Sequence, residues 1–233
     1  VKEIVMVSPP DREGKLNPYT LVAAAEVGIG EIYKMGGAQA IFALACGTGT
    51  VKKVDLITGP GNIYVTVAKK LVYGEVNIDM LAGPSEITII ADQSADPAYL
   101  AADMLSQAEH DVLARSILVT DDGGLIDRVE EEISKQVKTL SRREIIEQAL
   151  EANGAFILTS DLEEACRVVN LIAPEHLELM VEKPFDLLSK VKNAGAIFLG
   201  PYTPEPVGDY YAGPNHILPT GGTARFSSPV TVD

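Results

Sequence analysis

The sequence has few cysteines, few positive charges and no long apolar run, and each shortage argues against a class of protein. The two cysteines, Cys46 and Cys166, lie far apart in apolar helical patterns. Neither a disulfide framework nor a cysteine metal motif is expected, and both residues are expected to be small and buried. Lys and Arg number 19 against 33 Asp and Glu, and the net charge of −14 argues against an extended phosphate-binding surface. Nucleic acid is therefore not an expected partner.

No apolar run approaches the length of a bilayer-spanning helix, and residues 1–7 have the pattern of a strand instead of a signal peptide. We therefore expect a cytoplasmic protein without a membrane partner. Because the chain begins in a strand without an initiator methionine, we also expect a fragment. The usual dinucleotide-binding fingerprint is lacking, because neither Gly28 and Gly30 nor Gly47 and Gly49 continue into G-x-G-x-x-G.

Strand and helix patterns alternate in the first third of the chain. Asn17 followed by Pro18 marks a helix start, a capping residue before a proline in the first turn. Strands are expected at 4–7, 31–35 and 54–58, and helices from residue 18, at 38–46 and at 63–72. This βαβαβα order implies a parallel sheet with helices on its faces.

A second series of strands and helices follows, and we expect the junction between the two series at Gly83-Pro84. Its strands are expected at 86–91, 116–120, 156–159, 177–181 and 196–199, and its helices from Asp96 towards His110, at 124–139 and at 161–172. Beyond Gly200 the pattern gives way to a long loop rich in Pro, Gly and Tyr, and such loops are usually functional or disordered. The predicted fold is α/β, with two Rossmann-like parallel-sheet units that carry helices on both faces, the second incomplete.

The three histidines, His110, His176 and His216, all lie in short polar clusters beside a carboxylate or an amide. Histidine is the commonest metal ligand and the side chain most readily tuned to transfer protons near neutral pH. A single histidine of this kind is more often a surface or satisfied residue. Three in such contexts indicate a chemical site.

Gln107 and His110 stand three residues apart near the end of the helix that starts at Asp96, so their side chains leave the same face. Both could reach one cation, and Asp209 could add an anionic ligand. Glutamine is an unusual ligand for zinc. On spacing alone, a capped helix end remains the alternative.

Glu175 and His176 follow Pro174, which ends the preceding helix. A glutamate and a histidine at a strand entrance are suited to act as general bases on two different protons. A solvent-exposed loop is the alternative.

Two glycine-containing turns are further candidates. Gly59-Pro60-Gly61-Asn62 lies between a strand and a helix, where free amides and Asn62 could bind an anion or a nucleotide hydroxyl. Ser85 stands at a strand start and could bind substrate. A plain turn explains each segment equally well.

Six motifs occur in a fixed order along the chain, and together they resemble those of the histidinol dehydrogenase family over essentially all 233 residues. Each motif alone is weak, whereas six in order are specific. They are Gly36-Gly37-Ala38-Gln39-Ala40-Ile41, Gly59-Pro60-Gly61-Asn62, Ala82-Gly83-Pro84-Ser85-Glu86, Leu105-Ser106-Gln107-Ala108-Glu109-His110, Ala173-Pro174-Glu175-His176-Leu177-Glu178 and Gly213-Pro214-Asn215-His216-Ile217-Leu218-Pro219.

The resemblance implies a zinc- and NAD-dependent, four-electron oxidation of L-histidinol, through L-histidinal, to L-histidine. His176 would be the base for the substrate hydroxyl, and Glu175 would activate water for the second oxidation. Zinc would hold the substrate's imidazole and amine without acting in hydride transfer. The implied contacts are Gln107, His110 and Asp209 for zinc, Ser85, Gln107, His110, His176, Asp209 and His216 for substrate, and Gln39 and Asn62 for NAD.

Family chains extend beyond both ends of this sequence. The resemblance places a tyrosine that contacts NAD before Val1. After Asp233 it places the fourth zinc ligand, a histidine, and a substrate-contacting glutamate, in a tail that reaches the partner subunit of a homodimer. We therefore expect residues 1–84 to form a Rossmann-like NAD-side domain and residues 85–233 a second Rossmann-like half-domain that carries the zinc and catalytic residues.

Two functions remain open. The first is the oxidoreductase of the parent enzyme. The alternative is a catalytically silent α/β fragment, and the missing zinc ligand and tyrosine favour inactivity for these 233 residues alone.

Overall fold

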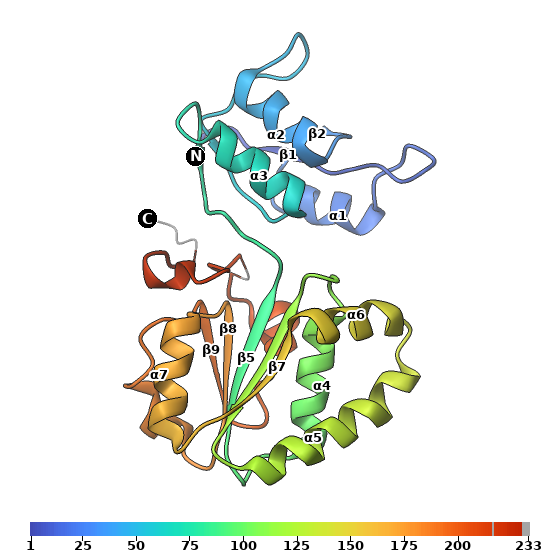
Figure 1. Ribbon diagram of the computed structural model, residues 1–233. Helices are drawn as coiled ribbons and strands as arrows, with labels where there is room; N and C mark the ends of the chain where they lie inside the picture. The colour runs from blue at the N-terminus through green and yellow to red at the C-terminus, as the bar shows by residue number, and fades with distance from the viewer. Residues whose placement is uncertain (216, 230–233) are drawn as a thin grey trace. The chain divides into compact units, whose positions relative to one another are not determined.

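A computed structural model describes residues 1–215 and 217–229, which form two compact units, unit 1 at Val1–Leu81 and unit 2 from Ala82 onwards (Figure 1). His216, a predicted substrate contact, lies outside the described residues. In the described part of the chain, no helix is both long and apolar enough to cross a membrane.

Unit 1 contains two parallel strand pairs and the helices between them. The elements are β1 (Val5–Val7) paired with β2 (Glu31–Tyr33), β3 (Leu56–Ile57) paired with β4 (Asn77–Ile78), and helices α1 (Pro18–Glu26), α2 (Gly37–Cys46) and α3 (Ile63–Val72). Helices α2 and α3 contribute Ile41, Leu44 and Ala68 to the apolar core. The parallel direction of the pairing was predicted, but the strands form two separate pairs instead of the expected single sheet, and the two-residue strand β4 is too short to give a sequence pattern.

The described residues of unit 2 form a five-stranded parallel sheet in the order β7-β6-β5-β8-β9. Its strands are β5 (Glu86–Ala91), β6 (Arg115–Thr120), β7 (Gly154–Leu158), β8 (His176–Met180) and β9 (Ala196–Leu199). The chain runs outwards from β5 to β7 and then returns to β8 on the other side of β5. This reversal makes β5 and β8 neighbours, with Ile87 opposite His176.

Helices cover both faces of this sheet, which confirms the predicted α/β class. Side chains of α4 (Pro97–Ala108) and α5 (Gly123–Gln136) pack on one face against Ile87, Ile89 and Leu118. Side chains of α7 (Leu162–Ile172) and α8 (Pro184–Leu188) pack on the other face against Ile90 and Leu179. Helix α6 (Arg143–Asn153) forms a smaller core with the end of α4.

Several helices begin at the residues that the sequence indicates. The side chains of Asn17, Asp96 and Asp161 accept hydrogen bonds from the first free amides of α1, α4 and α7. Such a cap typically contributes about 1 kcal/mol, because it satisfies a donor that has no partner within the helix.

Three features differ from the expectations. Helix α6 was not predicted, because its apolar residues are interspersed with charges. Cys46 is exposed at the end of α2, so its predicted burial is wrong, whereas Cys166 is buried as predicted. The segment after Gly200 contains the short helical turns α9 (Glu205–Val207), η2 (Gly208–Ala212) and η3 (Thr223–Arg225).

Candidate functional site

The candidate site is built on one face of β8. Leu177 and Leu179 point into the apolar core, so the alternation of a strand places His176 and Glu178 together on the opposite face. Both are buried, at 4% and 1% exposure. The alternative of a solvent-exposed loop therefore does not hold for His176.

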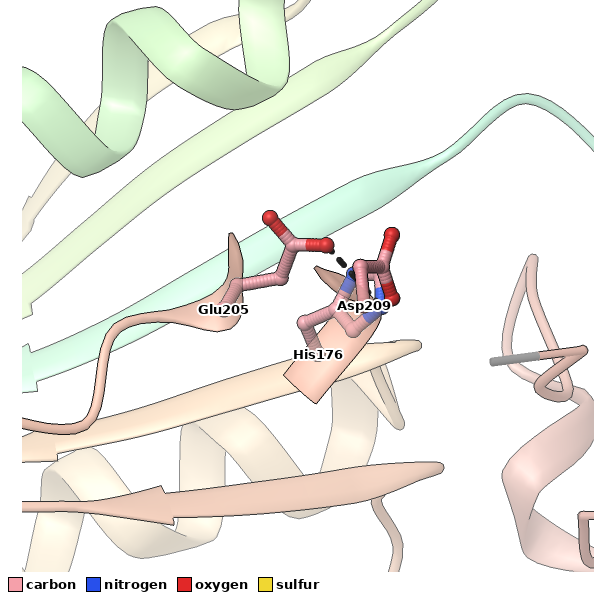
Figure 2. Close-up of side chains that lie close together, drawn as sticks. All are labelled: His176, Glu205 and Asp209. Carbon is pink, nitrogen blue, oxygen red and sulfur yellow. Dashed lines mark ion pairs between the residues drawn. The ribbon is translucent and has the colours of Figure 1, made fainter. Parts of the chain in front are cut away.

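Two acceptors fix the ring of His176. Its Nδ1 lies 3.2 Å from the main-chain oxygen of Glu86 and 3.2 Å from Oε1 of Gln107. A main-chain oxygen can only accept, so we assign the proton to Nδ1, which leaves Nε2 as the basic nitrogen. Nε2 faces Glu205, whose Oε1 lies 3.9 Å away (Figure 2).

Three side chains from three elements meet here. Ligand atoms of His176, Glu205 and Asp209 all lie within 4.8 Å of one another, which is a spacing that could hold a metal ion (Figure 2). Glu205 comes from α9 and Asp209 from η2, and the segment is tied to β8 because the Glu205 amide donates to Oε1 of Glu178 at 2.8 Å. Imidazole and carboxylate oxygens suit zinc.

Helix α4 faces this group with two polar residues one turn apart. Gln107 is 1% exposed, and its Nε2 has no hydrogen-bond partner among the described residues. Asp103 is buried beside Glu178. We refer to His176, Glu178, Glu205, Asp209, Asp103 and Gln107 as the buried polar cluster.

Burial controls the charge of these carboxyl groups. It raises the pKa of Asp103 to about 6, and it raises the pKa of Glu205 to about 8, with a further contribution from Asp209. The pKa of Glu178 is also raised, by burial and by Asp103. A cation would relieve this repulsion, because an opposite charge nearby favours the ionised form. The donor set and its charge therefore fit a metal such as zinc.

Glu175 lies next to the cluster at 5% exposure. Its Oε2 accepts the amide hydrogen of Glu86 at 3.0 Å and lies 3.7 Å from Nδ1 of His176. Burial raises the pKa of Glu175 to about 9, and the negative charges of nearby carboxylates, led by Glu86, raise it further. The hydrogen bond from the Glu86 amide acts in the opposite direction and lowers it. A group shifted this far towards the protonated form is a candidate for proton transfer.

The position of the cluster in the sheet is unusual. Glu86 and His176 are the first residues of β5 and β8, so the cluster lies at the amino edge of the parallel strands. Ligands of open α/β sheets generally bind at the carboxyl edge. Here the segment after β9 folds back along β8 and delivers Glu205 and Asp209 to the amino edge.

A cavity of about 250 Å³ lies beside Asp209. The ring of Phe198, which lines it, is 6.1 Å from the imidazole of His176 between centroids. The remaining lining residues are Gly195, Ala196, Gly208, Pro214, Asn215, Leu218 and Pro229. The cavity offers space for a small molecule next to the buried polar cluster.

The other predicted site residues of unit 2 lie at different places. His110 is exposed just beyond α4, and its Nδ1 lies 3.0 Å from the main-chain oxygen of Ser106, an arrangement that matches the capped helix end. It is not a member of the group formed by His176, Glu205 and Asp209. Ser85 is half-buried directly before β5, and its main-chain oxygen accepts from the amide of Arg115.

Gln39 and Asn62 lie in unit 1, apart in the sequence from the catalytic candidates. Gln39 is exposed on α2. Asn62 is exposed at the start of α3, and its Oδ1 accepts from the amides of Tyr64 and Val65 at 3.1 and 3.2 Å. Any contact with a ligand would therefore use the amide nitrogen of Asn62 as donor.

Asp103, Glu178 and Glu205 were not predicted from the sequence. Asp103 and Glu178 could have been found from the sequence, because each places a carboxylate at a position where the pattern calls for an apolar residue. Glu178 occupies an inward position in a strand, and Asp103 stands in a stripe with Leu100, Met104 and Gln107. Glu205 gave no such signal, since only the folded segment after β9 brings it to His176.

Comparisons with known proteins agree over the whole chain. The sequence profile described as "Histidinol dehydrogenase" matches residues 1–233. Histidinol dehydrogenases of Heliobacterium mobile and Carboxydothermus hydrogenoformans are 65% and 63% identical over 233 residues, which are 100% of this chain and 54% and 55% of those proteins. The crystal structure of histidinol dehydrogenase from Elizabethkingia anophelis superposes with a TM-score of 0.93 at 44% identity, covering 97% of this chain and 52% of that one. The chain thus spans about half the length of these relatives.

Proposed function

Because the chain belongs to the histidinol dehydrogenase family, we propose that it is part of an NAD- and zinc-dependent enzyme that oxidises L-histidinol, through L-histidinal, to L-histidine. The observation that carries this proposal is the buried His176, whose Nδ1 is held by two acceptors and whose Nε2 faces the carboxylates beside a cavity. Identities of 65% and 63% over the whole chain favour this function over a silent α/β fragment.

In the first oxidation, His176 acts as the general base. Nε2 takes the proton of the substrate hydroxyl and becomes part of a protonated imidazole. Bound NAD⁺ would supply the acceptor for the hydride that leaves the carbon, so that L-histidinal results. The hydrogen bonds from Nδ1 to Glu86 and Gln107 hold the ring throughout and stabilise the positive charge that forms.

In the second oxidation, Glu175 acts on water. Its carboxylate takes a proton as water adds to the aldehyde, which leaves the anion of the hydrate. Loss of hydride from this anion, which a second bound NAD⁺ would accept, would give the carboxyl group of L-histidine. The raised pKa makes Glu175 a stronger base once ionised, and a positively charged ligand in the neighbouring cluster would favour that ionised form.

Of the group formed by His176, Glu205 and Asp209, only Asp209 would bind zinc, together with Gln107 and His110, so Nε2 of His176 stays available as the base. The fourth ligand would be supplied from the partner subunit of a homodimer. Bound there, zinc would supply charge that holds the imidazole and amine of the substrate. Gln107 and Asp209 are members of the buried polar cluster, and Nε2 of His110 remains for a ligand because Nδ1 faces Ser106. The substrate contacts would be Ser85, Gln107, His110, His176, Asp209 and His216.

The cofactor would be contacted by Gln39 and Asn62. We accordingly assign the NAD side to residues 1–84 and the zinc and catalytic residues to residues 85–233. A cytoplasmic location is part of the same proposal.

Formation of NADH from L-histidinol by the complete protein that contains this chain tests the proposal. His176→Asn should abolish most of the rate, whereas Glu182→Gln, an exposed residue just after the same strand, should leave it unchanged. Full activity of His176→Asn would contradict the proposal.

Zinc is tested separately by equilibrium dialysis of the complete protein. His110→Ala should bind the metal more weakly, and Glu147→Gln, exposed on α6, serves as control. Zinc affinity that His110→Ala leaves unchanged would remove His110 from the ligand set.

A further inference from the structure

Unit 1 contains a buried ion pair that none of the functions above uses. Lys69 on α3 contacts Oδ1 of Asp79, which directly follows β4, and their side chains are 2% and 0% exposed. Taking two charges out of water costs several kcal/mol per ion, and apolar residues of similar volume often give equal or greater stability. The pair therefore calls for an explanation other than stability.

Both charged groups also bind the main chain of one loop residue. The Gly59 amide donates to Oδ2 of Asp79 at 2.8 Å, and the Lys69 ammonium donates to the Gly59 oxygen at 3.0 Å. Oδ1 of Asp79 in addition accepts from the Met80 amide at 2.6 Å. The ion pair thus binds both polar main-chain groups of Gly59.

Gly59 has a backbone conformation that needs such support. Its φ of +120° is rarely adopted by other residues, although open space surrounds the position where a Cβ would stand. Two residues later, a Cβ on Gly61 would lie 2.5 Å from the side chain of Val65. The backbone conformation of Gly59 and the close contact between Gly61 and Val65 therefore both restrict the path of the loop at 59–62.

This loop leads directly to Asn62. The Oδ1 atom of Asn62 is used to cap α3, so the direction of its free amide nitrogen follows from the path of the loop and the start of the helix. A hydrogen-bond donor on an exposed turn binds a ligand well only when its direction is fixed before binding.

We propose that Lys69 and Asp79 are positioning residues that fix the loop at 59–62 for contact with the nicotinamide dinucleotide. This inference rests on the proposed function, because that function assigns the loop to the cofactor. The ion pair acts through Gly59 and does not itself touch the ligand.

The test replaces both charges in the complete protein. A single substitution would leave the other charge buried alone and could unfold unit 1, so the informative variant is Lys69→Met with Asp79→Leu, which keeps the volume apolar. We expect the KM of this variant for NAD⁺ to rise about tenfold, which is the effect of losing one or two hydrogen bonds to the ligand. Its KM for L-histidinol should stay unchanged. Lys70→Met and Glu75→Gln, exposed neighbours, are the matched controls.

A direct readout of the loop separates this inference from the proposed function. Hydrogen exchange at the Gly59 amide should accelerate in the double variant, because this amide donates to Asp79 in the parent. A folded double variant with normal exchange and a normal KM for NAD⁺ would overturn the inference. If the double variant does not fold, Lys69→Met with Asp79→Asn, which leaves no charge buried alone and keeps an acceptor for the Gly59 amide, tests the contact between Lys69 and the Gly59 oxygen. If Asn62→Ala leaves KM for NAD⁺ unchanged, the assignment of the loop to the cofactor fails, even where exchange shows that the ion pair orders it.

Discussion

His176 brings two different nitrogens into the site, and its neighbours decide their roles. The main-chain oxygen of Glu86 can only accept, so Nδ1 carries the proton and Nε2 is left as the base. Glu175 reaches the same strand position by a hydrogen bond from the Glu86 amide. One residue of β5, Glu86, therefore orients both catalytic candidates, His176 through its main-chain oxygen and Glu175 through its amide.

The two catalytic candidates should differ in which half-reaction they affect. General acid–base groups typically contribute a factor of about 10²–10⁴, so Glu175→Gln should slow the oxidation of L-histidinal by up to that factor and the oxidation of L-histidinol much less. His176→Asn should slow both, because the alcohol proton and the second step need the same imidazole. Single-turnover rates with each substrate measure the difference. Equal slowing of both steps by Glu175→Gln would show that the division is wrong.

The raised pKa of Glu175 also predicts how stability depends on pH. The folded pKa is about 9 and the ordinary value is 4.5, so the folded state binds the proton more tightly. The stability that this provides is complete below about pH 4.5 and is lost as the pH rises through 9. In urea unfolding with a chelator present, Glu175→Gln should therefore gain stability over the parent near pH 8 and much less near pH 5. A stability difference that does not vary with pH would contradict the burial argument.

At the scale of elements, the sequence predicted the helices and strands whose ends are set by local features such as turns and caps. Helix α3 and strands β5 and β9 have the expected bounds, because each combines a clear apolar pattern with a turn or cap at its ends. Helix α6 was missed, since Ile146, Ala149 and Leu150 have helical spacing but lie among charges. The meeting of Asp103 with Glu178 could not be predicted, because only tertiary packing brings α4 to that position on β8.

Glu178 illustrates how an element holds the site together. Its Oε1 accepts the amide of Glu205 and so fixes α9 against β8. Glu178→Gln keeps an acceptor of the same length, whereas Glu178→Leu leaves the buried amide without a partner, at a cost of about 1–3 kcal/mol. We expect unfolding free energy and kcat to fall in the Leu variant and to stay close to the parent in the Gln variant.

Glu182→Leu is the control for this pair of variants, because Glu182 is exposed just beyond the same strand. The same stability and kcat in Glu178→Leu and Glu178→Gln would show that the hydrogen bond to Glu205 does not position the segment.

At the scale of the whole molecule, two kinds of binding residue are divided between two compact units. The proposed cofactor contacts and the Lys69–Asp79 ion pair lie in unit 1, and the buried polar cluster lies in unit 2. The family resemblance predicted Asn62 in unit 1 and Gln107, His176 and Asp209 in unit 2 from short motifs. It did not predict the Lys69–Asp79 ion pair or the buried carboxyl groups of Asp103, Glu178 and Glu205, because a short motif indicates which residues act, whereas hydrogen bonds and burial depend on the fold.

This division predicts that substitutions in the two units affect different ligands. Asn62→Ala should raise KM for NAD⁺ about tenfold, the effect of losing one good hydrogen bond, and leave KM for L-histidinol unchanged. Asp209→Asn should do the reverse, because it removes negative charge from the cluster that would hold zinc and the cationic substrate. Initial-rate kinetics of the complete protein with each substrate varied in turn measure both values. If Asp209→Asn raised only the KM for NAD⁺, the cofactor would have to be assigned to the buried polar cluster, and the proposed division between the units would be wrong.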